Sequence, residues 1–196
     1  FNVDGHERFH PYTRINQNGP DESGWRATAQ NYNLNRDFIK ADAPETRAAL
    51  ALLSSWDPDV FVDLHTTNGS YHGYALTYSP SLNPAAVHGG PFARDVLLPE
   101  LRRRTARRGV ATFDYGNFVS NDSVSRGWFT YDHRPRFGTN YYGLRGGIAV
   151  LAEAYSHDPF ARRVASMSVS ASSQRPSPER ARASVDASWP PKRACR

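Results

Sequence analysis

Residues 60–67 read Val-Phe-Val-Asp-Leu-His-Thr-Thr, and residues 148–153 read Ile-Ala-Val-Leu-Ala-Glu. Both are short apolar runs with β-branched residues, a pattern typical of strands buried in a sheet. Each run reaches a polar side chain as it ends, His65 in the first and Glu153 in the second. Ligands of α/β sheets gather outside the carboxyl ends of the strands. The two stretches therefore predict core strands with a functional site at their ends.

The rest of the chain alternates between helical and strand patterns. Residues 44–55 and 92–108 have the apolar spacing of helices, and residues 74–78 and 110–115 resemble strands. Residues 1–39 contain many Gly, Pro and Asn residues, which indicates a long loop. We therefore expect an α/β domain over residues 1–160, with a mixed, mostly parallel sheet flanked by helices.

Residues 161–196 differ in composition from the rest. They are rich in Ala, Arg, Ser and Pro and show no helical or strand periodicity, so we expect a disordered tail or a segment read in a shifted frame. Eight of the 24 Lys and Arg residues lie here, but only two of the 19 Asp and Glu residues. The domain itself is close to neutral, which argues against a nucleic-acid partner because a phosphate-binding face should belong to the folded part.

Other classes of site and partner are constrained by what the sequence contains. The single cysteine, Cys195, lies in the tail, so residues 1–160 predict neither disulfides nor a cysteine-type zinc site. No apolar stretch is long enough to predict a membrane span. Oligomeric state and compartment are left open; a secreted or periplasmic location is one option, because a signal peptide would precede Phe1.

Two arginines and an amide in the loop region are candidates for anion binding. Arg26 lies in a Gly-rich segment, and Asn35 and Arg36 follow in Asn-Leu-Asn-Arg-Asp. A guanidinium group binds a carboxylate through two parallel hydrogen bonds, and an amide adds another donor. The alternative is a solvated loop in which an arginine pairs with Asp37.

His65 and Glu153 each have a structural alternative to a functional role. A neutral imidazole at a strand end suits a metal ligand, although a lone histidine there is more often simply hydrogen bonded. A carboxylate that ends a buried strand either pairs with an arginine or has a raised pKa and acts as a base. The residues alone do not decide between these interpretations.

The motifs, taken in order, resemble those of zinc carboxypeptidases across residues 1–160. The ordered set is Asn2-Val3-Asp4-Gly5, Trp25-Arg26, Asn35-Arg36-Asp37, Asp63-Leu64-His65 and Leu151-Ala152-Glu153. Each motif is short, but their order is specific. The resemblance implies hydrolysis of C-terminal peptide bonds on one zinc ion, with a substrate that carries a free terminal carboxylate.

The resemblance also implies a role for each motif residue. His65 would be a zinc ligand, Glu153 the general base, and Arg26 the group that stabilises the oxyanion. Asn35 and Arg36 would bind the terminal carboxylate. A tyrosine would cover the substrate, with Tyr141 and Tyr142 as first candidates and Tyr131 as a third.

The sequence departs from this family at its start. The other two zinc ligands would come from an H-x-x-E motif before Asn2, and the chain contains no such motif there. We therefore expect a truncated zinc-carboxypeptidase-like domain that is inactive as it stands. Two alternatives remain: a related zinc amidase or deacylase acting on cell-wall peptides or acyl-amino acids, and a non-catalytic remnant that still binds peptide carboxylates.

Overall fold

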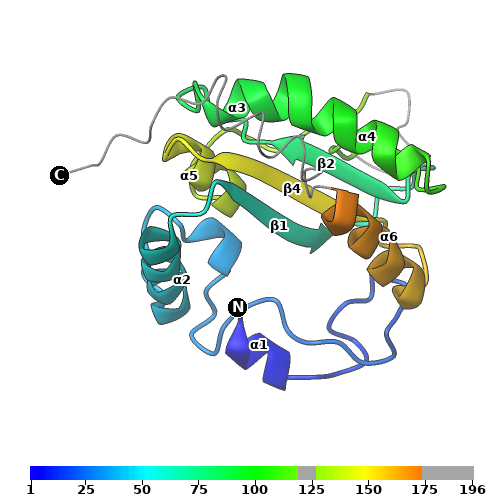
Figure 1. Ribbon diagram of the computed structural model, residues 1–196. Coiled ribbons are helices and arrows are strands. Elements are labelled where there is room, and N and C mark those ends of the chain that lie inside the picture. Colours follow the sequence, from blue (N-terminus) through cyan, green and yellow to red (C-terminus); the bar gives the residue numbers. More distant parts are fainter. Residues whose placement is uncertain (119–126, 174–196) are drawn as a thin grey trace.

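A four-stranded mixed sheet organises the protein (Figure 1). The computed structural model describes residues 1–118 and 127–173. The strands are β1 (Val60–Thr66), β2 (Leu76–Pro80), β3 (Thr112–Asp114) and β4 (Ile148–Ala154), in the order β1-β4-β2-β3. The β1–β4 and β2–β3 pairs are parallel, and only β2–β4 is antiparallel. The predicted mixed, mostly parallel sheet is confirmed.

One face of the sheet carries the hydrophobic core. A nearly continuous helix lies along it, made of α3 (Gly89–Phe92), the π-helical segment η2 (Ala93–Leu97) and α4 (Leu98–Ala106) (Figure 1). Leu98 and Leu101 of α4 pack in one buried cluster with Val150 and Ala152 of β4. Because side chains alternate along a strand, Leu151 and Glu153 must point to the opposite face. That face is where the candidate site lies.

Shorter helices and loops occupy the opposite face. Helix α5 (Gly138–Leu144) contacts β1 and β4, whereas α1 (Val3–Glu7), the 3₁₀ turn η1 (Leu34–Arg36) and α2 (Pro44–Trp56) lie along the loop-rich part of the chain (Figure 1). Helix α2 begins at Pro44, whose fixed φ suits the first helical position. The sequence predicted α2 to within one residue, but it did not predict α1, η1 or α5.

Residues 161–173 are helical, contrary to the prediction of a non-periodic tail. They belong to α6 (Phe160–Ser173), which packs against α4 and β4. Its buried positions are Arg163, Ser166, Ser170 and Ser173, three or four residues apart. The spacing is helical, but three serines and one arginine occupy the buried stripe where the periodicity rule expects apolar side chains. The remainder of the expected tail, residues 174–196, lies outside the described residues.

Strand β1 is less buried than its apolar sequence predicted. It occupies an end of the strand order and pairs with β4 on one side. Val60 is 41% exposed and Leu64 is 53% exposed. Strand β4 lies inside the sheet and is buried throughout, as expected. Among the described residues, no helix combines the length and apolarity needed to cross a bilayer.

Candidate functional site

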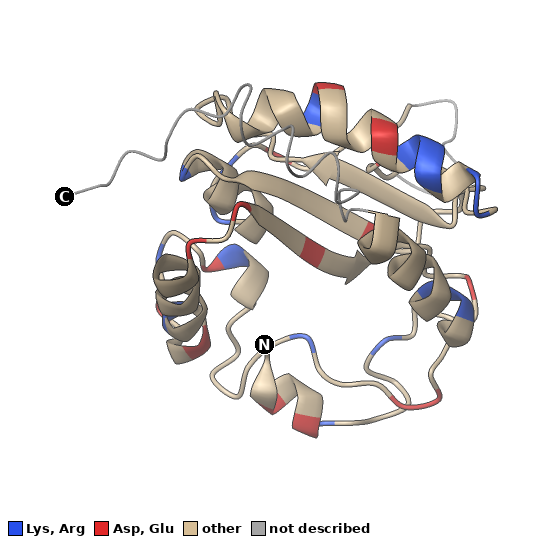
Figure 2. Ribbon diagram, viewed as in Figure 1, with Lys and Arg blue, Asp and Glu red and all other residues tan. Residues whose placement is uncertain are grey.

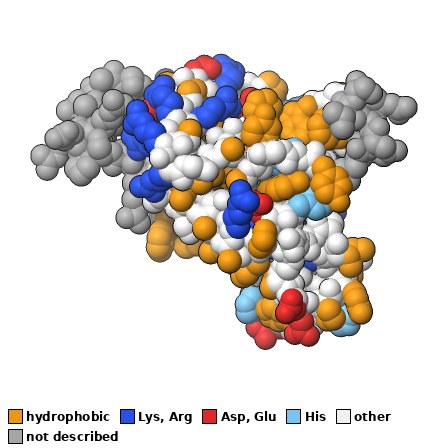
Figure 3. All heavy atoms as spheres, turned by 90° about the vertical axis from the view of Figure 1, so that its right-hand side faces the viewer, with side chains coloured by type: hydrophobic (Ala, Val, Ile, Leu, Met, Phe, Trp, Pro, Cys, Tyr) orange, Lys and Arg blue, Asp and Glu red, His pale blue; other side chains and the backbone are white. Residues whose placement is uncertain are grey.

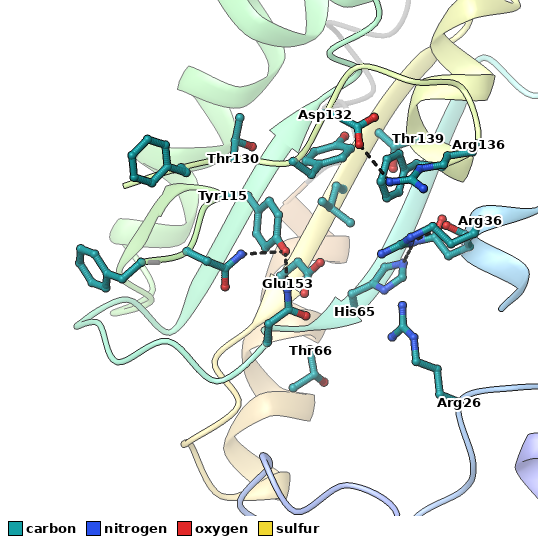
Figure 4. Close-up of a pocket in the computed structure, with 18 residues that line it drawn as sticks. Arg26, Arg36, His65, Thr66, Tyr115, Thr130, Asp132, Arg136, Thr139 and Glu153 are labelled. Carbon is teal, nitrogen blue, oxygen red and sulfur yellow. Dashed lines mark hydrogen bonds and ion pairs between the residues drawn. The ribbon is translucent and has the colours of Figure 1, made fainter. Parts of the chain in front are cut away.

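His65 and Glu153 lie side by side at the carboxyl ends of two parallel strands. The register of β1 and β4 pairs these two residues directly, so both side chains leave the same face of the sheet. Figure 4 shows them at the centre of a group of polar side chains. The structure thus places the polar ends of the two predicted strands next to each other.

A cleft of about 410 Å³ opens over these two residues. Arg26, Asn35 and Arg36 line it together with His65 and Glu153. The residues that the sequence marked as anion-binding and catalytic therefore share one cavity, although they come from two loops and two strands. The remaining walls are mostly aromatic and polar, and include Tyr115, Phe129, Tyr131, Asp132, Arg136 and Phe137.

The Asn2-Val3-Asp4-Gly5 motif holds the loop that carries Arg26. Asn2 accepts a hydrogen bond from the Gly5 amide at 3.0 Å and donates to the Arg26 carbonyl oxygen at 2.9 Å. The Asp4 carboxylate accepts from the Ala29 amide at 2.8 Å. A Cβ at Gly5 would collide with the Trp25 carbonyl oxygen, so only glycine permits this approach. The motif is thus a brace for Arg26, not a part of the cleft wall.

The Asn35-Arg36-Asp37 motif is held in a similar way. The Asn35 side chain accepts from the Gly138 amide at 3.0 Å, which ties it to the start of α5. The Asp37 carboxylate accepts from the amides of Asp42 and Ala43. Although burial opposes it, these hydrogen bonds lower the pKa of Asp37. Asp37 therefore organises the approach to α2 and makes no ion pair with an arginine among the described residues, so the alternative of an Arg–Asp37 pair is wrong for them.

Glu153 is a buried carboxylate without a close cationic partner. It is 6% exposed, its Oε2 atom has no hydrogen-bond partner, and no ion pair within the described part of the chain includes it. Burial raises its pKa to about 7, against the opposing charges of His65, Arg26 and Arg36. The charge of Asp63 adds to the rise. A carboxyl group with this pKa takes up and releases protons near neutral pH, as a general base requires.

His65 is held by a neighbouring carboxylate. Its Nε2 atom lies 2.8 Å from Asp63 Oδ1 and 3.4 Å from Asn35 Nδ2. Burial lowers the pKa of His65, but the hydrogen bond to Asp63 and the charges of Asp63 and Glu153 outweigh that effect, so the pKa is raised overall. Asp63 and His65 are two residues apart on one strand, so they share a face.

The donors in the cleft do not make a zinc site on their own. A catalytic zinc ion needs three protein ligands. Across residues 1–118 and 127–173, no group of three His, Cys, Asp or Glu side chains is arranged to hold a metal. His65 can supply one nitrogen: its Nε2 atom is engaged with Asp63, which leaves Nδ1 as the possible ligand atom. The described residues therefore fit one zinc ligand and not a complete set.

The tyrosines that line the cleft are not the two that were favoured from the sequence. Tyr142 is 4% exposed, packs on Phe61 of β1, and donates its hydroxyl hydrogen to the Pro58 carbonyl oxygen. Tyr141 packs on Phe38 and is absent from the cleft wall. Both belong to α5, whose buried side faces the sheet. The structure therefore does not bring Tyr141 and Tyr142 to the cleft wall, because both rings pack elsewhere.

Tyr131 and Tyr115 occupy the cleft instead. Burial raises the pKa of both, and that of Tyr115 reaches about 12, so each hydroxyl remains protonated at neutral pH. Tyr131 was the third candidate, whereas no sequence motif selected Tyr115. Asp132, Arg136 and Phe137 were also not selected. Their segment precedes α5 without any local pattern, and only the fold brings it over Glu153 (Figure 4).

Comparison with known proteins finds relatives by fold and not by sequence. No family model and no curated protein matches the chain. The fold is similar to that of a candidate carboxypeptidase from Burkholderia mallei, with a TM-score of 0.57 and 16% identity over 77% of this chain. It is also similar to a metallo-carboxypeptidase from Burkholderia cenocepacia, with a TM-score of 0.54 and 15% identity over 77% of this chain.

A third similar structure contains a ligand. It is a metallo-carboxypeptidase from Pseudomonas aeruginosa in complex with (2-guanidinoethylmercapto)succinic acid, with a TM-score of 0.55 and 15% identity over 76% of this chain. The present chain spans 38–40% of the length of these three proteins. The carboxypeptidase-like fold implied by the motifs is thus confirmed.

Proposed function

We propose that this chain carries the carboxylate-binding and proton-accepting part of a zinc carboxypeptidase site. The parent reaction is hydrolysis of the C-terminal bond of a peptide or peptide-like substrate. The observation that supports it most is the pairing of His65 with Glu153 across β1 and β4, in a cleft that Arg26 and Arg36 also line. Short motifs spread over more than a hundred residues converge there with the groups that peptide hydrolysis requires.

Each side chain has a role that its position supports. Arg36 and Asn35 would bind the terminal carboxylate, since they lie together on η1 at the cleft wall. Arg26 has no side-chain partner among the described residues, and Figure 4 shows it directed toward His65. Its free guanidinium would stabilise negative charge on the scissile carbonyl oxygen. Glu153 would accept the proton of the attacking water and return it to the leaving amine.

Zinc belongs to this proposal only when two further ligands are supplied. Bound zinc would provide Lewis-acid chemistry, but the described residues offer His65 alone. We therefore expect the chain by itself to bind peptide carboxylates without turnover and to bind zinc weakly. Residues 1–196 taken alone would then bind peptide carboxylates without hydrolysing them. Stoichiometric zinc retained after dialysis, with peptidase activity, would show this expectation to be wrong.

A carboxylate ligand is also in keeping with the structural relatives. The ligand named for the Pseudomonas aeruginosa protein is a succinic acid derivative. In the present cleft, the groups placed to bind such a ligand are guanidinium and amide donors. A carboxylate accepts hydrogen bonds from both, and the guanidinium group binds it with matched geometry.

The test is binding of a peptide acid against its amide. Isothermal titration of the full chain with N-acetyl-Ala-Leu and with its C-terminal amide should give binding of the acid only. Arg36→Gln should weaken acid binding by about tenfold or more, because it removes a charge-assisted contact worth about 1.5–3 kcal/mol. Arg145→Gln is the matched control, since Arg145 donates to Ser54 and does not line the cleft. Equal affinity for acid and amide would refute the proposed function.

A further inference from the structure

The cleft holds more positive charge than one terminal carboxylate requires. Three arginines line it, Arg26, Arg36 and Arg136, against the carboxyl groups of Asp132 and Glu153. Glu153 is only 6% exposed, and the Asp132 carboxylate is ion-paired with Arg134, which is not part of the cleft wall. Figure 2 shows basic segments on the loops that face β1. The cleft wall thus carries more guanidinium than carboxyl groups.

The charge of Asp132 is already balanced from outside the cleft. Its carboxylate accepts from Arg134 Nε at 2.9 Å and from Arg134 Nη2 at 2.7 Å, a two-pronged contact that binds strongly. Arg136 Nη2 shares the same carboxylate at 3.1 Å. Arg134 is not part of the cleft wall, whereas Arg136 is. One carboxylate therefore serves two guanidinium groups, and the net positive charge remains on the cleft side.

Arg136 has an unused donor. Its Nε atom is buried and has no hydrogen-bond partner, although the side chain as a whole is 38% exposed. A buried donor left without a partner is unfavourable by about 1–3 kcal/mol. The Arg136 guanidinium lies 4.8 Å from the centre of the Phe137 ring, and that of Arg36 lies 4.4 Å from it. The same ring thus positions both cations in one cleft.

The two cations affect each other. Burial lowers the pKa of Arg36, and the charges of Arg26 and Arg136 lower it further. Like charges held this close repel one another until an anion binds between them. In the proposed function, Asn35 and Arg36 bind the terminal carboxylate of the substrate. Arg26 and Arg136 are then available to bind further negatively charged groups.

We infer that the cleft selects substrates whose C-terminal residue has an acidic side chain, with Arg136 binding the second carboxylate. This specificity rests on the proposed function, since Arg36 must hold the terminal carboxylate for the side chain to be directed at Arg136. Asp132 does not select a basic side chain, because Arg134 and Arg136 already occupy it.

The test compares three peptides of matched size, N-acetyl-Ala-Glu, N-acetyl-Ala-Gln and N-acetyl-Ala-Lys, by isothermal titration of the full chain. We expect the Glu peptide to bind about tenfold more tightly than the Gln peptide, which is about 1.4 kcal/mol, and the Lys peptide to bind most weakly. The preference for Glu should shrink as salt is added, because screening weakens the interaction of partly exposed charges.

The Arg136 variants test the assigned residue. Arg136→Gln should remove the Glu preference and leave affinity for the Gln peptide nearly unchanged. Arg136→Lys should retain part of the preference, because it keeps the charge and loses the planar donor pair. Arg145→Gln should behave as the parent chain. Circular dichroism confirms that each variant is folded before titration.

The outcomes separate this inference from the proposed function. Equal binding of Glu and Gln peptides, or tighter binding of the Lys peptide, overturns the acidic specificity while carboxylate recognition stands. A Glu preference that survives Arg136→Gln overturns the role of Arg136. Failure of every peptide acid to bind removes the proposed function, and the inference with it.

Discussion

Replacing Glu153 by Gln should stabilise the folded chain above neutral pH. The pKa of Glu153 is about 7 in the folded state and about 4.5 in the unfolded chain, and burial is the main cause of the rise. A tenfold difference in proton affinity corresponds to about 1.4 kcal/mol. The ionised carboxylate therefore destabilises the fold by about 3 kcal/mol at pH 8. Gln has nearly the same shape and never ionises, so it avoids this penalty.

The direction of the pH dependence follows from the proton count. Between pH 4.5 and 7 the folded chain holds the Glu153 proton more tightly than the unfolded chain does. Stability from this group is therefore full below pH 4.5, falls as the pH rises, and is constant above pH 7. The difference in unfolding free energy between Glu153→Gln and the parent chain should be near zero at pH 4.5 and about 3 kcal/mol at pH 8.

Urea unfolding at several pH values, followed by circular dichroism, measures this difference. Using the difference between two chains cancels the contributions of carboxylates that are common to both. Glu22→Gln is the control, since Glu22 is exposed and lies outside the cleft, and its profile should superimpose on that of the parent. A Glu153→Gln chain that is less stable than the parent at pH 8, or a difference that does not change with pH, would refute the assignment of Glu153 as a buried group that ionises near neutrality.

Three further predictions concern residues that hold the site together. Tyr142→Phe should lower the unfolding free energy by about 1 kcal/mol, because one buried hydrogen bond to Pro58 is lost; peptide-acid affinity should not change, and a loss of affinity would restore a binding role to Tyr142. Asn2→Ala should destabilise the chain by about 1–2 kcal/mol and also weaken peptide binding, because Asn2 holds the backbone of Arg26; unchanged binding in titration would argue against the brace. Arg163→Ala should cost about 2–4 kcal/mol in urea unfolding, since this buried arginine donates to Gln17 and to backbone oxygens; a neutral result would mean that α6 does not dock.

The basic residues at the surface of α4 are partly neutralised by pairing within the helix. Helix α4 has its basic residues toward its C-terminal end (Figure 2), and Arg103 and Arg104 both pair with Glu100. On the face shown in Figure 3, basic side chains gather in one upper region and are mixed with acidic and apolar ones. Arg103 and Arg104 are thus paired within their own helix, as on a solvated helix surface.

The strands and their polar ends were readable from local sequence. The β-branched apolar run Ile148–Leu151 favours a buried strand, and a carboxylate two residues after it stands out against that background. The ordered motifs also assigned Arg26, Asn35, Arg36, His65 and Glu153 to a single site, and all five line one cleft. Local sequence was sufficient for His65 and Glu153, because each is a polar side chain that follows an apolar run.

The places of Tyr131, Tyr142 and Arg136 relative to the cleft could be determined only from the tertiary structure. Tyr131 and Tyr142 both precede Glu153 in the sequence, and the packing of α5 on β1 is what makes Tyr142 a core residue. Helix α6 was not predicted because serines, not leucines, fill its buried stripe. Arg136 is a candidate binding residue only because the fold places it on Phe137, beside Asp132 and in the same cleft as Glu153. Burial, pKa and charge balance depend on groups distant in sequence, so no local pattern contains them.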